Sequence, residues 1–116
     1  MEGKKVAVSL CILETNDEYL LIHRGKKKQS IEECVNMYIP IGGKLESFET
    51  PEDCCIREVK EETGIDIVEP EFLGIITETS PLSKYNWIDY VFYKKIEKQP
   101  LLECDEGDFC WIAKKI

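Results

Sequence analysis

One helix stands out in a sequence that otherwise favours strands. The stretch Pro51 to Thr63 has Thr50 as its N-cap and a proline at its first position, where the missing N–H would have no partner in any case. Asp53 complements the positive end of the helix dipole, and Gly64 is a natural C-terminal stop. These signals predict a helix over residues 51–63 and exclude an all-β fold.

Apolar runs on both sides of this helix predict strands. Val6 to Leu13 is almost continuously apolar, as in a strand covered on both faces, and Tyr19 to His23 follows a polar turn, as in a hairpin. Tyr38 to Ile41 contains Pro40 and is expected at an edge or a bend. Three strands are expected after the helix, the second of them central: Phe72 to Glu78, Tyr85 to Ile96 and Phe109 to Ala113.

Length and charge limit the classes of protein to consider. A chain of 116 residues is long enough for one core but not two, so we expect one domain over residues 1–116. The net charge of −8 argues against a nucleic-acid partner, because such binding depends on neutralising phosphates. No secretory or membrane-spanning segment is recognised, so we expect a cytoplasmic protein without a membrane partner. The six cysteines form no C-x-x-C pair and are expected to be reduced and mostly buried.

Three glutamates gather on one face of the predicted helix. Glu58, Glu61 and Glu62 are spaced i, i+3 and i+4, and like charges at this spacing destabilise a helix by roughly 0.2–0.5 kcal/mol per pair. Arg57 offsets part of this repulsion, and a divalent cation would offset much more. Three neighbouring carboxylates form the oxygen-rich site that Mg²⁺ prefers. A solvated acidic face is the alternative explanation of the same spacing.

The residues around these glutamates favour the metal site. The segment Gly43 to Ile65 reads GKLESFETPEDCCIREVKEETGI. It resembles the signature of the Nudix hydrolases, G-x5-E-x7-R-E-U-x-E-E-x-G-U with U a bulky aliphatic residue, at every specified position. The motif covers 23 residues, about a fifth of the chain. The order of elements around it, a hairpin before and strands after, is also similar to that family.

This resemblance implies a fold and a reaction. The implied fold is an α+β Nudix fold, a mixed β-sheet in an α/β/α sandwich with helix 51–63 on one face. The implied reaction is hydrolysis of a pyrophosphate bond in a nucleoside diphosphate derivative with Mg²⁺, for which Mn²⁺ can substitute. A nucleoside triphosphate, oxidised forms included, is the favoured small-molecule substrate, giving a monophosphate and pyrophosphate. The alternatives are ADP-ribose or nucleotide-sugar hydrolysis, dinucleoside polyphosphate cleavage, and a nucleotide-sensing domain without turnover.

The resemblance also assigns roles to residues of the motif. Glu58 is the expected general base, and Arg57 is expected to hold Glu49 by a charged hydrogen bond. Glu61 completes the expected catalytic set. The expected metal ligands are Glu58, Glu61, Glu62, a backbone carbonyl of Gly42 or Gly43, and Glu106. Glu106 lies outside the motif, and a solvated loop carboxylate is its alternative explanation.

Candidates for substrate contacts lie outside the helix. Arg24 ends a predicted strand and could meet phosphates, and Lys44 directly follows the glycine pair. Tyr85 and Trp87 could stack on a base to which Asp89 hydrogen-bonds, although core packing explains the two aromatic residues equally well.

The end of the sequence raises an expectation about the sheet. Domains of the family usually continue past the last strand into a second helix, whereas this sequence ends at Ile116 without one. One sheet face should then lack its helix and expose apolar side chains. Either a homodimer that covers this face or a second helix that lies beyond Ile116 is therefore expected.

Overall fold

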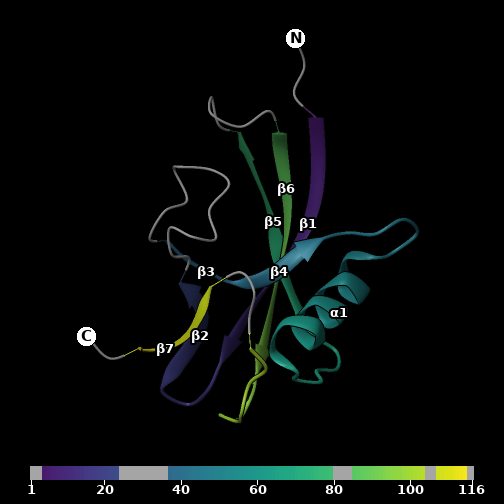
Figure 1. Cartoon of the computed structure of the whole chain (residues 1–116). Helices are drawn as coiled ribbons and strands as arrows, with labels where there is room; N and C mark the ends of the chain where they lie inside the picture. Colours follow the sequence, from purple (N-terminus) through teal and green to yellow (C-terminus); the bar gives the residue numbers. More distant parts are fainter. Residues whose placement is uncertain (1–3, 24–36, 80–84, 104–106, 115–116) are drawn as a thin grey trace.

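The computed structural model describes residues 4–23, 37–79, 85–103 and 107–114. They form one mixed sheet with a single helix packed on it (Figure 1). The elements are β1 (Lys4–Glu14), β2 (Glu18–His23), β3 (Tyr38–Ile39), β4 (Ile41–Lys44), α1 (Pro51–Thr63), β5 (Glu71–Thr79), β6 (Tyr85–Lys95) and β7 (Asp108–Ala113).

The sheet is organised around β1. This strand pairs with β6 in parallel along its whole length, and its other edge is shared by β4 and β2, both antiparallel. β5 pairs antiparallel with β6, while β3 and β7 both pair with β2. The predicted mixed sheet is therefore confirmed, and β6 is central because it lies between β1 and β5. Pro40 separates β3 from β4, as expected for a proline at a bend.

The helix α1 begins and ends where its caps predict. The Thr50 hydroxyl accepts a hydrogen bond from the Asp53 N–H at 3.1 Å, and Gly64 closes the helix in the left-handed region at φ 85°. Its buried side chains, which include Cys55 and Val59, pack on one face of the sheet. The core that results contains Cys11, Leu13, Leu20, Ile22, Ile41, Cys55, Val59, Ile65, Ile67 and Phe92.

The described residues hold one helical layer rather than two. Apart from α1, which is too short and too polar to cross a membrane, they contain no helix, so the second layer of the expected α/β/α sandwich is not found among them. Several apolar side chains of the edge strand β5 are about half exposed: Phe72, Leu73, Ile75 and Ile76. These side chains do not share one face, because Phe72 and Ile75 pair with residues on the side of α1 and Ile76 pairs with Asp89 on the other side, so they do not form the single uncovered face that was expected. A homodimer stays a prediction.

The cysteines follow expectation where the structure describes them. Cys11, Cys54 and Cys55 are buried thiols, and Cys110 is half-buried. None of these four forms a disulfide. The other two, Cys34 and Cys104, lie outside the described residues.

Phe48 carries local backbone strain in the loop before α1. Its φ is 64°, a region that costs an L-residue about 1–2 kcal/mol, and its side chain is fully exposed, so no burial offsets that cost. We expect Phe48→Gly to raise the free energy of unfolding by about 0.5–1 kcal/mol, since glycine loses part of the gain through greater freedom in the unfolded chain. Urea titration measures the change. Ser47→Gly, in the same loop, is the control and should give no increase; a loss of stability in Phe48→Gly would contradict the prediction.

Candidate functional site

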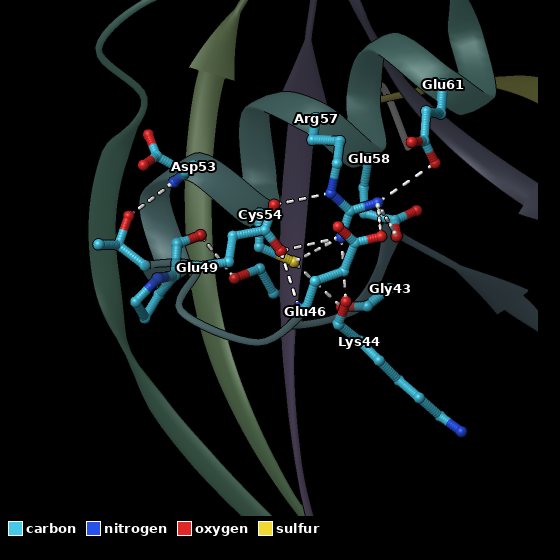
Figure 2. A network of polar contacts seen from close by, with 12 residues as sticks. Gly43, Lys44, Glu46, Glu49, Asp53, Cys54, Arg57, Glu58 and Glu61 are labelled. Atoms are coloured by element: carbon cyan, nitrogen blue, oxygen red, sulfur yellow. Dashed lines mark hydrogen bonds and ion pairs between the residues drawn. The ribbon is translucent and has the colours of Figure 1, made fainter.

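Arg57 lies at the centre of a network that joins α1 to the preceding loop (Figure 2). Its Nε and Nη2 donate to the two carboxylate oxygens of Glu49 at 2.7 and 3.0 Å, a bidentate pair. Nη1 donates to Glu58 at 3.0 Å and to Glu61 at 3.2 Å. Nη2 also donates to the Lys44 carbonyl at 3.1 Å. The structure thus brings together the four side chains expected to form the catalytic set.

Arg57 controls the ionisation of Glu49. The guanidinium hydrogen bond lowers the pKa of Glu49 to about 2, and the Glu46 N–H, which donates to the same carboxylate at 2.9 Å, acts in the same direction. In turn, Glu49 and then Glu58 raise the pKa of Arg57. The pair is therefore fully ionised at neutral pH. The side chain of Glu49 is only 12% exposed, so its charge is held largely by the protein.

Gly43 in β4 leaves room for the carboxylate of Glu58. A Cβ added to Gly43 would lie 2.4 Å from the carboxyl carbon of Glu58, so a larger residue there would displace this carboxylate. A Cβ added to Gly42 would lie 2.1 Å from the carbonyl oxygen of Ser9 in β1. Both positions therefore require glycine, because the backbone of Gly43 lies close to Glu58 and the backbone of Gly42 lies close to β1. Glu58 is 14% exposed as a result.

The donor set suits a hard divalent cation. Glu58 and Glu61 already converge on one cationic nitrogen of Arg57, and every side-chain donor of the set is a carboxylate oxygen. Glu62 lies one turn beyond Glu58 on the same helix and is half-buried. Within the described part of the chain, however, no three acidic, histidine or cysteine side chains stand in metal-binding geometry. The assignment of metal ligands therefore stays a prediction.

Cys54 belongs to this site although its sequence position gave no sign of a role. Its thiol is fully buried and donates to the Gly43 carbonyl at 3.5 Å, while Arg57 Nη2 lies 3.8 Å from the sulfur. Burial raises the pKa of Cys54 to about 11, so the thiol is protonated at neutral pH. Glu46, 3.8 Å from Arg57, was missed as well; its three-residue spacing from Glu49 was the available signal.

The expected substrate residues lie on the other face of the sheet. Gly43 faces Glu58 and α1, so Lys44, the next residue of the strand, faces away, as Figure 2 shows. The Lys44 ammonium lies 5.7 Å from the centre of the Tyr85 ring, which is 5.3 Å from the Trp87 ring. Val8 pairs with Lys44 on one edge of β1 and with Asp89 on the other. These side chains therefore share one surface.

Asp89 is the unusual group of this surface. It is 5% exposed, and burial raises its pKa to about 7, with the Glu78 carboxyl on the neighbouring strand acting in the same direction. Asp89 can therefore hold a proton near neutral pH and donate a hydrogen bond. Glu78 was not among the predicted residues. Two predicted residues, Arg24 and Glu106, lie outside the described residues, and their roles stay predictions.

The similarity to known proteins extends over almost the whole chain. The family model of the NUDIX domain matches residues 3–114. Nudix hydrolase YvcI of Bacillus subtilis strain 168 is 31% identical over 108 residues, which cover 90% of this chain and 63% of YvcI. The 8-oxo-dGTP diphosphatase of Proteus vulgaris is 45% identical over 40 residues, 34% of this chain and 36% of that protein. This chain therefore spans less than two thirds of either relative.

A solved structure supports the same comparison at the level of the fold. The MutT protein of Bacillus halodurans superimposes with a TM-score of 0.76 at 26% sequence identity. The match covers 94% of this chain and 69% of that one. The mixed sheet and the helix packed on it are thus shared with the matched part of that structure.

Proposed function

This chain belongs to the Nudix family, and on that premise we propose that it is a Mg²⁺-dependent hydrolase of pyrophosphate bonds in nucleoside diphosphate derivatives. The observation that carries the proposal is the Arg57 network, which holds Glu58 and Glu61 together beside Gly43 of β4. In a solvated acidic face, Glu58 would be exposed rather than largely buried. A side chain at position 43 would also not collide with it.

The residues of the site divide the chemistry between them. Glu58, Glu61, Glu62 and a backbone carbonyl of Gly42 or Gly43 would hold Mg²⁺, which when bound would neutralise charge on phosphoryl oxygens and lower the pKa of a bound water. Glu58 accepts a proton from the attacking water as the new oxygen–phosphorus bond forms. The anhydride bond between the α- and β-phosphates, on the side opposite the attacking water, breaks, and its electron pair leaves with the pyrophosphate or the nucleoside monophosphate, whichever is not attacked. Arg57 and Glu49 keep the loop and the helix in place.

A nucleoside triphosphate is the substrate that we propose, oxidised nucleotides included. The names of two relatives support it: one is an 8-oxo-dGTP diphosphatase and the other a MutT protein. The surface of Lys44, Tyr85, Trp87 and Asp89 offers a cation, two aromatic rings and a buried carboxyl, which suit a base and its ribose. Lys44 connects this surface to the metal site, because its carbonyl accepts from Arg57.

A product assay tests the proposal. The protein is incubated with Mg²⁺ and with dGTP, 8-oxo-dGTP, ATP, ADP-ribose or diadenosine polyphosphates, and the products are separated by anion-exchange chromatography. We expect a monophosphate and pyrophosphate from a triphosphate, with EDTA abolishing turnover. Preferred cleavage of ADP-ribose or a dinucleotide would replace the substrate class. Absence of turnover on all of them, with Mg²⁺ or Mn²⁺, would overturn the enzyme proposal in favour of a sensor.

The proposed base contact predicts a pH-dependent KM. Asp89 is protonated below its raised pKa of about 7, so its hydrogen bond to the base is present there and lost as the pH rises. We expect KM to increase about three- to tenfold between pH 6 and pH 8.5. Asp89→Asn keeps a donor at all pH values and should flatten this profile. Glu97→Gln, an exposed carboxylate elsewhere, should leave it unchanged; a profile that survives in Asp89→Asn would contradict the assignment.

A further inference from the structure

Two adjacent cysteines of α1 lie in very different surroundings. Cys55 packs in the apolar core together with Cys11. Cys54 is equally buried, yet its thiol points into the polar network shown in Figure 2. Packing alone explains Cys55, because free cysteine behaves as a small apolar residue. It does not explain a thiol directed at polar partners.

The partners of the Cys54 thiol come from separate parts of the site. It donates to the Gly43 carbonyl in β4 at 3.5 Å and lies 3.8 Å from Arg57 Nη2 on the next turn of the helix. The Ser9 hydroxyl in β1 acts to lower the pKa of Cys54, and the Cys54 thiol acts to lower the pKa of Glu49 in the loop, so both groups lie in its electrostatic surroundings. The Ser9 hydroxyl donates a hydrogen bond to the Pro51 carbonyl, at the start of α1, at 2.7 Å. One sulfur atom therefore contacts both segments that must be aligned for Glu58 to lie against Gly43, namely β4 and the turn of α1 that carries Arg57.

We propose that Cys54 is a positioning residue for the metal site: its thiol fixes the Gly43 carbonyl and the Arg57 guanidinium relative to each other. The inference rests on the metal-dependent function proposed above. A hydrogen bond to a metal ligand from a residue that does not itself touch the metal orients that ligand before the metal binds, and its loss weakens metal binding while the ligands themselves remain. Alanine would fill much of the same space without a donor, whereas serine would keep the donor.

Metal affinity without substrate tests this role. Mn²⁺ binding is measured by electron paramagnetic resonance for the wild-type chain, Cys54→Ala and Cys54→Ser, with thermal unfolding of each variant. We expect Cys54→Ala to raise the Kd for Mn²⁺ about three- to tenfold and Cys54→Ser to stay within about twofold of wild type. Cys55→Ala is the matched control, since it should lower the unfolding temperature without changing the Kd.

The outcomes separate this inference from the proposed function. A wild-type chain that binds no Mn²⁺ would overturn the metal-dependent function together with the role of Cys54. If the wild type binds Mn²⁺ and Cys54→Ala binds it equally well, only the role of Cys54 fails. It fails also if serine and alanine weaken binding to the same extent. Should Cys54→Ala not fold, the comparison of serine with wild type decides, and a tenfold weaker affinity in Cys54→Ser would overturn the inference.

Discussion

Glu58→Gln is expected to reduce kcat/KM by about 10³-fold or more while the fold is retained. Glutamine has nearly the volume of glutamate, so it still fits against Gly43, and its amide oxygen can still accept from Arg57. It cannot, however, take a proton from water, and loss of a general base alone costs about 10²- to 10⁴-fold. Loss of an anionic metal ligand adds to this effect. Steady-state kinetics and thermal unfolding of the same preparation measure the two parts of the prediction.

The same helix provides a control for Glu58→Gln. Glu52 is an exposed carboxylate in the first turn, away from the Arg57 network, so Glu52→Gln changes the charge of α1 equally and should leave kcat/KM within about twofold. Near-full activity in Glu58→Gln would contradict its role as base and ligand. Lost activity accompanied by a large fall in unfolding temperature would mean that the substitution damaged the fold instead.

The helix could be predicted from sequence because its ends are fixed locally. The Thr50 side chain and the left-handed Gly64 act within a few residues of the helix, and its observed bounds are those predicted. The mixed sheet was predicted from the resemblance and confirmed. The pairing of Arg57 with Glu49 also came from the motif, and the structure adds its bidentate geometry.

Contacts between distant segments could not be predicted in this way. Glu78 lies near Asp89 only through the register of β5 on β6, and that register shifts between Phe72 and Gly74; a glycine within a strand indicates a bulge but not which residues pair beyond it. The Cys54 thiol meets the Gly43 carbonyl because α1 packs across β4. A helical projection identifies which residues face the sheet but not which of them meet polar groups there.

Arg57→Met is expected to lower the free energy of unfolding at pH 7 by about 2–4 kcal/mol and to lower activity with it. Methionine keeps the stem of the side chain but removes every donor, which leaves the Glu49 and Glu58 carboxylates, both largely buried, without their cation. Lys60→Met, one turn later, is the matched control: it breaks the exposed Lys60–Asp66 ion pair and should cost less than about 1 kcal/mol.

The pH dependence of this loss identifies its cause. Because Arg57 lowers the pKa of Glu49 from 4.5 to about 2, their pair stabilises the folded chain fully above pH 4.5 and progressively less as the pH falls toward 2. The difference in unfolding free energy between wild type and Arg57→Met should therefore be largest at neutral pH and shrink between pH 4.5 and 2. Urea titrations at several pH values measure it. A difference that stays constant over this range would show that Arg57 stabilises the fold by packing rather than by its charge.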